Sequence, residues 1–101
     1  MSRFVLAPSA AADLVLIWRY VLTESSLEMA NRVETVIRSK IMTLVRTSGA
    51  GHIRQDLTKA DVRFFPVYSY LIVYRPETRP LQIVAILHGA RNVSRILKKR
   101  V

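Results

Sequence analysis

The sequence VRFFPVYSYLIVYRPETRPLQIVAILHGAR, residues 62–91, decides the fold. It holds three apolar runs, at 62–67, 70–75 and 81–87, and they are rich in the β-branched and aromatic residues that favour strands. The breaks between the runs are too short for crossover helices, so neighbouring strands are predicted to be antiparallel. Segment 76–80 (PETRP) has the length and composition of a hairpin loop. The stretch therefore predicts a three-stranded meander.

The chain before the meander begins with a short apolar segment, 3–7 (RFVLA), which predicts a strand. Pro8 ends this strand because proline has no amide to donate, and Ser9 is the expected N-cap of a helix over 10–22. Asp13 lies off the apolar stripe of that helix. The stripe consists of Leu14, Ile17, Trp18 and Val21.

A second helix is expected to follow after a short break. Ser25 and Glu28 have the spacing of a capping box, and the helix is predicted to run to about Arg46. Glu34 and Arg38 are placed to form an ion pair on its outer face. The inward stripe is predicted to be Ala30, Val33, Ile37, Ile41 and Leu44. Because the break is short, the two helices should form an antiparallel hairpin that buries both stripes on the sheet.

The rest of the chain predicts little regular structure. Residues 47–61 are expected to form a solvated connector, Ser94 to cap a short final helix, and the basic tail 98–100 to be frayed. The predicted fold is therefore a single α+β domain, 1–101, in the order β-α-α-β-β-β-α, with an antiparallel sheet and the N-terminal helical hairpin packed on one face. The strands at 70–75 and 81–87 are apolar on both sides, so a second cover is expected from the tail, a second copy or a partner.

Composition excludes several kinds of site. The chain has no cysteine and two histidines, so no metal site and no cofactor is predicted. It has no run of apolar residues long enough to cross a membrane, and its first residues lack a signal-peptide core, so a cytoplasmic protein is expected.

The charge is uneven. The net charge is +9; residues 1–37 carry three basic and four acidic groups, whereas residues 38–101 carry thirteen basic and three acidic groups. The basic excess thus coincides with the meander and its flanks. Such a field favours an acidic protein, a nucleic acid or an anionic surface as partner.

No nucleophile motif, paired carboxylates or phosphate-binding glycine loop is present. The residues left to carry a function are those on the meander, namely Arg63, Tyr70, Tyr74, Arg75, His88 and Arg91. They could bind an RNA backbone, stabilise the charge on a phosphate during cleavage, or grip an acidic protein. Two structural alternatives remain open: the arginines could pair with Asp61 or Glu77, and the tyrosines could be half-buried sheet residues.

The chain resembles the RelE/ParE superfamily of bacterial toxins from type II toxin–antitoxin systems. The resemblance rests on Pro8-Ser9, Ala12-Asp13-Leu14, Ile17, Tyr20, segments 63–67 (RFFPV), 70–75 (YLIVYR) and 86–91 (ILHGAR), and Ile96-Leu97. It implies a β-α-α-β-β-β core with a short C-terminal helix, and an acidic antitoxin that wraps the toxin in a hetero-oligomer. ParE-like members poison DNA gyrase by binding, whereas RelE-like members are ribosome-dependent endoribonucleases that cut mRNA.

Two differences from the typical family sequences bear on whether the chain is closer to the ParE or the RelE branch. The ending at His88 to Arg91 resembles ParE, and no tyrosine or histidine follows Arg91, which argues against the nuclease chemistry of the RelE branch. If the chain were nevertheless a nuclease, Arg63, Arg75 and Arg91 would stabilise phosphate charge and His88 would act as acid or base. ParE members often have Gly-Arg between the second and third strands, where this chain has Tyr68-Ser69, so a looser turn is expected there.

Overall fold

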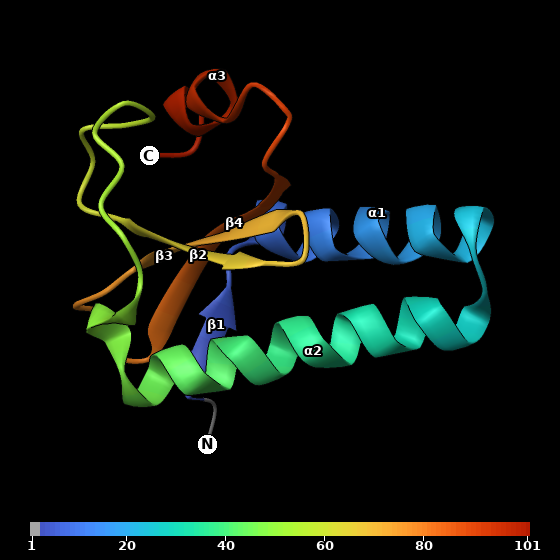
Figure 1. Cartoon of the computed structure of the whole chain (residues 1–101). Coiled ribbons are helices and arrows are strands. Elements are labelled where there is room, and N and C mark those ends of the chain that lie inside the picture. Colours follow the sequence, from blue (N-terminus) through green and yellow to red (C-terminus); the bar gives the residue numbers. More distant parts are fainter. Residues whose placement is uncertain (1–2) are drawn as a thin grey trace.

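The computed structural model describes residues 3–101. Its elements are β1 (Phe4–Leu6), α1 (Pro8–Glu24), α2 (Leu27–Arg46), a 3-10 turn η1 (Ser48–Ala50), β2 (Arg63–Val67), β3 (Tyr70–Arg75), β4 (Leu81–His88) and α3 (Val93–Lys98). The predicted α+β class and element order are confirmed. The helical hairpin lies along one side of the sheet and extends beyond it, while α3 lies on the other side (Figure 1).

The sheet has the strand order β1-β4-β3-β2. The predicted meander is confirmed, because β2 pairs with β3 and β3 with β4 in antiparallel register. β1, however, pairs with β4 in parallel, with Phe4 opposite Leu81 and Leu6 opposite Ile83, so the sheet as a whole is mixed and not antiparallel throughout. An apolar edge strand carries no signal for its direction, which explains why the sequence did not reveal this pairing.

The face of the sheet toward the hairpin forms the larger core. All five residues of the predicted α2 stripe are buried, and so are Leu14 and Ile17 of α1. All of them except Ala30 belong to one cluster with the sheet residues Val67, Ile72, Tyr74, Leu81, Ile83 and Ile86. The outer ion pair of α2 is also present, with Arg38 Nε 3.2 Å from Glu34 Oε2. The 3.6-residue period thus placed α2 correctly.

The opposite face of the sheet has its own cover, supplied by the C-terminal segment. Val93 and Leu97 of α3 pack with strand residues that include Phe64, Val73 and Leu87. A β-bulge at Val73/Tyr74 shifts the register between β3 and β4, so that Ile83 and Ile86 face the hairpin while Val84 and Ala85 both face α3. The two covers explain why β4 is apolar on both sides, and the bulge explains why the adjacent residues Val84 and Ala85 share one face.

The predicted caps of the first two helices were each misplaced. α1 begins one residue before Ser9, at Pro8, without a side-chain cap. Proline fits the first helical position because the amide that it lacks has no partner within a helix there. α2 is capped by Ser26, whose hydroxyl accepts from the Met29 amide at 3.1 Å, and not by Ser25.

At α3 the cap is the Asn92 side chain, which accepts from the Arg95 amide at 3.2 Å, so the predicted Ser94 cap is wrong. Asparagine at this position satisfies an early helical amide as serine would have done.

The turn between β2 and β3 is tight, contrary to the expectation of a looser one. Val67 pairs directly with Tyr70, which leaves only Tyr68 and Ser69 in the turn. Tyr68 has φ 53°, and it is the only non-glycine residue among 3–101 with a positive φ. Its side chain is 55% exposed, so the ring meets no crowding that would open the turn. The chain therefore accepts left-handed strain at Tyr68.

Candidate protein-interaction site

The structure divides the six predicted site residues between the two ends of the meander. Tyr70 pairs with His88 at one end, whereas Tyr74 pairs with Arg63 and Arg75 with Gln82 at the other. Tyr70 and Arg75 are five residues apart along β3, or about 17 Å at the usual strand rise. The six residues therefore do not form one site, and each end has to be considered by itself.

At the end that carries Arg63, the polar side chains of the sheet are hydrogen-bonded to backbone groups of the loop that follows α2. Tyr74 is fully buried; its hydroxyl donates to the Ser48 carbonyl at 2.6 Å and accepts from the Gly51 amide at 2.9 Å. Arg63 Nη1 donates to the Gly51 carbonyl at 3.0 Å. Burial raises the pKa of Tyr74, so this hydroxyl stays protonated at neutral pH. Arg63 and Tyr74 fasten the loop to the sheet, and we call this the closed end.

Arg75 lies at the same end of the meander and has a different environment. It is half-buried, and its guanidinium makes no hydrogen bond or ion pair within residues 3–101. The predicted alternatives, Arg63 with Asp61 and Arg75 with Glu77, are not formed in that part of the chain.

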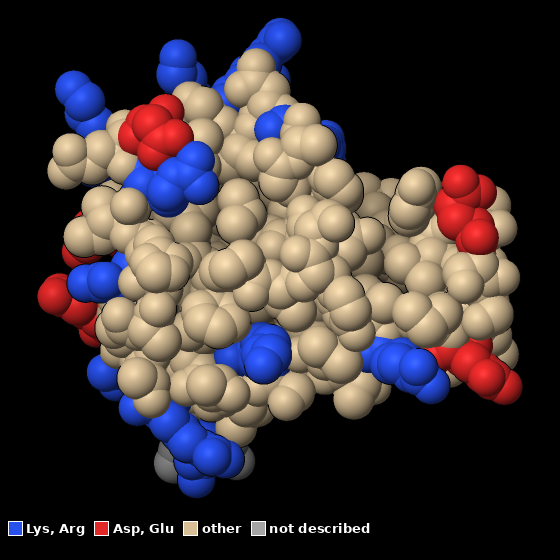
Figure 2. Space-filling model, viewed as in Figure 1, with Lys and Arg blue, Asp and Glu red and all other residues tan. Residues whose placement is uncertain are grey.

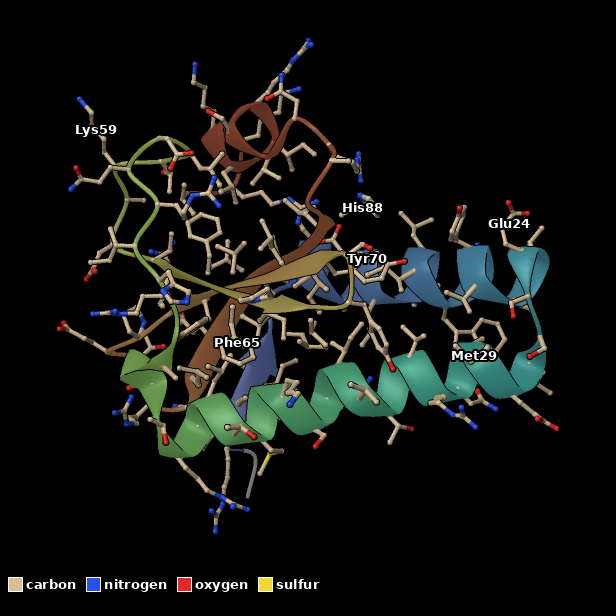
Figure 3. All side chains as sticks on the ribbon, viewed as in Figure 1. Glu24, Met29, Lys59, Phe65, Tyr70 and His88 are labelled. Carbon is tan, nitrogen blue, oxygen red and sulfur yellow. The ribbon has the colours of Figure 1, made fainter. Side chains whose placement is uncertain are left out.

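At the other end a pocket opens between α1 and the ends of β3 and β4. Its volume is about 340 Å³, and it is lined by Asp13, Leu16, Ile17, Tyr20, Tyr70, Ile86, His88 and Arg91. We call it the open-end pocket. Leu16 and Tyr20 are 58% and 61% exposed and lie one helical turn apart on the same face of α1. Figure 3 shows Tyr70 and His88 side by side at this end of the sheet.

Three polar side chains of the open-end pocket, Tyr70, His88 and Arg91, come from β3, β4 and the segment that follows β4. The His88 and Tyr70 rings meet edge to face, with centroids 5.5 Å apart. His88 Nδ1 accepts from the Ala90 amide at 3.1 Å, which leaves Nε2 to carry the proton of the neutral ring. Arg91 is exposed, and its guanidinium has no partner among residues 3–101. Burial, with a smaller effect of Tyr20, raises the pKa of Tyr70, so its hydroxyl is neutral near pH 7.

Asp13 forms part of the pocket, and the sequence analysis missed it. The residue is 6% exposed; Oδ2 accepts from the Ile86 amide at 3.0 Å, and Arg100 grips the carboxylate in a bidentate pair, with Nη2 3.0 Å from Oδ1. Hydrogen bonding to Asp13 raises the pKa of Arg100. The placement of Asp13 on the polar side of α1 and the frayed tail were both wrong.

The Asp13 carboxylate accepts a β4 amide hydrogen bond at a point that the short strand β1 does not reach. β1 pairs with β4 only as far as Ile83, and Asp13 takes the amide of Ile86 farther along the same strand. A signal was available in the sequence, because Ala10, Asp13, Leu14 and Ile17 follow the i, i+3, i+4, i+7 spacing of a buried helical face.

The open-end pocket is suited to binding a protein segment. Its walls are mostly apolar, with the Arg91 cation and the His88 imidazole at the rim. Such a pocket fits an apolar side chain with a carboxylate beside it. Its one carboxylate, Asp13, is already paired, so it is not free to serve as an acid or base. Within residues 3–101 no group of three metal-ligating side chains is found, and no helix there is long and apolar enough to span a bilayer.

The surface around the sheet is basic, with an uncharged area between the charges. Figure 2 shows many Lys and Arg side chains around the sheet half of the molecule, with a few acidic side chains among them, and further acidic side chains at the tip of the helical hairpin. The middle of this face shows few charged side chains. The charge asymmetry expected from the sequence is therefore also an asymmetry in space.

Comparison with known proteins agrees with this architecture. A family model described as "ParE toxin of type II toxin-antitoxin system, parDE" matches residues 4–93. Among solved structures, a chain of "Chromosomal ParDE TA system from P. aeruginosa" is 22% identical to this chain, covers 87% of it and 95% of its own length, and superposes with a TM-score of 0.71, which shows a shared fold. No curated protein matches.

Proposed function

The chain belongs to the family of ParE toxins of type II toxin–antitoxin systems, and from this premise we propose that it inhibits DNA gyrase by binding and is silenced by an acidic antitoxin. We further propose that it acts in the cytoplasm and is stored there as a toxin–antitoxin hetero-oligomer. The observation that carries the proposal is the open-end pocket, which offers apolar walls with the Arg91 cation and the His88 imidazole at its rim.

The antitoxin contact follows from the chemistry of that pocket. Covering Leu16 and Tyr20 would remove large apolar side chains from water, at about 25 cal/mol per Å² buried. An acidic residue of the same segment would reach Arg91 and His88 at the rim. The net charge of +9 would also accelerate association with an acidic partner.

Binding is favoured over catalysis because the groups that a nuclease would need are separated. His88 and Arg91 lie at the open end, but Arg75 lies at the opposite end. Arg63 is also at that opposite end, where its guanidinium is hydrogen-bonded to the Gly51 carbonyl. A phosphate held at His88 would thus be out of reach of two of the three expected arginines. This separation supports a toxin that acts by occupying a surface.

A supercoiling assay with purified gyrase tests the target. Added toxin is expected to inhibit supercoiling, and inhibition should be lost when a molar excess of the protein encoded by the neighbouring gene is included. Arg91→Gln should weaken inhibition, whereas Arg38→Gln, which removes an exposed arginine of α2 paired with Glu34, should not. Full gyrase activity at saturating wild-type toxin would exclude gyrase as the target.

The RelE-like alternative, an endoribonuclease acting on ribosome-bound mRNA, retains one favourable observation. His88 presents Nε2 beside Arg91 in an open pocket, which is a minimal acid–base and phosphate-binding pair. Primer extension on mRNA from cells that express the chain would then show new cuts in the ribosomal A site. Growth arrest without such cuts would eliminate this alternative.

A further inference from the structure

A second cavity lies at the opposite end of β4 from the open-end pocket. Its volume is about 470 Å³, and it is lined by the β1–α1 junction (residues 5–9), Arg75, Gln82, Ile83, Val84, Lys99 and Arg100. We call it the tail cavity, because the C-terminal residues form one wall. It shares no lining residue with the open-end pocket, so a ligand there would not compete directly for that pocket.

The tail cavity is cationic. Three of its lining residues, Arg75, Lys99 and Arg100, carry positive charge, and none is acidic. Arg100 is neutralised by Asp13, but the side chains of Arg75 and Lys99 make no ion pair within residues 3–101. Arg75 is half-buried in the lining, and its guanidinium donors are not used by any group of the described residues.

Neutral polar groups complete the lining. The Ser9 hydroxyl and the Gln82 amide belong to it, and neither side chain has a hydrogen-bond partner in the described part of the chain. Val5, Leu6 and Ile83 supply apolar walls. The volume lies within the range of about 300–1,000 Å³ that is typical of small-molecule sites.

We propose that the tail cavity binds a phosphate group, carried either by a free nucleotide or by a nucleic-acid backbone. The planar fork of the Arg75 guanidinium matches two phosphate oxygens, and Lys99 adds a mobile point charge. The Ser9 hydroxyl and the Gln82 amide donate to the remaining oxygens, while the apolar walls cover the uncharged part of the ligand.

Titration of the purified full-length chain tests the proposal. Inorganic phosphate, a nucleoside triphosphate and a short single-stranded oligonucleotide are added at constant ionic strength, and binding is measured by calorimetry. Arg75→Gln and Lys99→Gln are each expected to weaken phosphate binding about tenfold or more, since each removes a charge-assisted contact. The matched controls Arg79→Gln and Lys98→Gln remove exposed cations outside the cavity lining and should change affinity less than about twofold.

Comparing the affinities of the three ligands distinguishes a nucleotide from a nucleic-acid backbone as the source of the phosphate. Tighter binding of the triphosphate than of the oligonucleotide assigns a nucleotide site, and the reverse order, with a steep salt dependence, assigns a nucleic-acid site. Equal affinities of the cavity variants and their controls would overturn the proposal, as would wild-type protein that binds none of the three ligands. Thermal unfolding of each variant verifies that it is folded. The result is independent of whether the toxin inhibits gyrase.

Discussion

The two ends of the meander carry the same residue types in different states. Tyr70 and Tyr74 lie on the same face of β3, yet Tyr74 is fully buried with its hydroxyl bonded to Ser48 and Gly51, whereas Tyr70 lines an open pocket beside His88. The difference comes from the loop after α2, which reaches the closed end and not the open one. A tyrosine on this sheet is structural where backbone groups occupy its hydroxyl, and available to a partner where they do not.

The arginines repeat the contrast. Arg63 donates to the Gly51 carbonyl at 3.0 Å, while Arg91 is exposed and has no partner in the described residues. Removing a side chain that is hydrogen-bonded to the loop at the closed end, Arg63 or Tyr74, should therefore cost stability, and removing Arg91 at the open end should cost binding of a protein partner. Asp13 differs from the other residues of the open end, because it is buried and has a structural role.

The largest effect is expected from Asp13→Ala. The change leaves Arg100 and the Ile86 amide without their partner, and breaking such a pair from one side should lower the free energy of unfolding by about 3 kcal/mol. Urea denaturation measures the loss. Glu34→Ala is the matched control, since it removes an exposed carboxylate also paired with an arginine, and it should cost less than about 0.5 kcal/mol.

The double variant Asp13→Leu/Arg100→Met distinguishes the stabilisation that comes from the ion pair itself from the cost of leaving one buried charge unpaired. Removing both charges together should cost less than Asp13→Ala alone, because no unpaired charge remains. An equal or larger loss in the double variant would show that the pair itself, rather than the avoided unpaired charge, stabilises the fold.

Tyr74→Phe is expected to have the next largest effect. It leaves the Ser48 carbonyl and the Gly51 amide without the Tyr74 hydroxyl, which should cost about 2 kcal/mol. Tyr70→Phe removes the corresponding hydroxyl at the open end and should cost less than about 0.5 kcal/mol. Similar losses in the two variants would remove the distinction between the ends.

A smaller change of opposite sign is expected at the turn that leads into the open end. Tyr68→Gly relieves the left-handed strain at φ 53° and should raise the free energy of unfolding by about 0.5 kcal/mol after the entropy cost of glycine. Ser69→Gly is the control, because Ser69 has no positive φ, and it should be neutral or slightly destabilising. Stabilisation by Ser69→Gly alone would show that Tyr68 is not strained.

The least pronounced effect is expected at alkaline pH. The pKa of Tyr74 is raised above its ordinary value of 10.0 by burial, so above that pH the unfolded chain loses the proton before the folded one. Stability from the neutral hydroxyl is thus present below about pH 10 and is lost as pH rises through the folded-state pKa. Between about pH 8 and pH 11, wild type should lose more stability than Tyr74→Phe. Parallel losses would contradict the assignment.

Much of the fold could be predicted because local patterns encode it. The stripe of α2 was identified completely, since its burial follows the helical period. The meander followed from strand propensity and short connections. The β-bulge at Val73/Tyr74 and the direction of β1 could not be predicted, because they depend on how separate strands pack rather than on the residues of one strand.

The structure brings together three of the six residues that the sequence suggested for a site. Tyr70, His88 and Arg91 do line one pocket, but Arg63, Tyr74 and Arg75 do not belong to it. A meander alone implies this division, because the start of β2 and the end of β3 meet at one end while the start of β3 and the end of β4 meet at the other.

The ion pair between Asp13 and Arg100 could not be predicted from the sequence for a different reason. The two residues are 87 positions apart, and only the path of the whole chain brings them together.

The central claim is that the open end binds partners and the closed end holds the fold together. The dissociation constant between this chain and its proposed acidic antitoxin tests this claim most directly. It is measured for Arg91→Gln and for Arg95→Gln, which removes an exposed arginine of α3 outside the open-end pocket. Arg91→Gln is expected to weaken binding about tenfold or more, and Arg95→Gln to change it less than about twofold. Equal dissociation constants for the two variants would contradict the account.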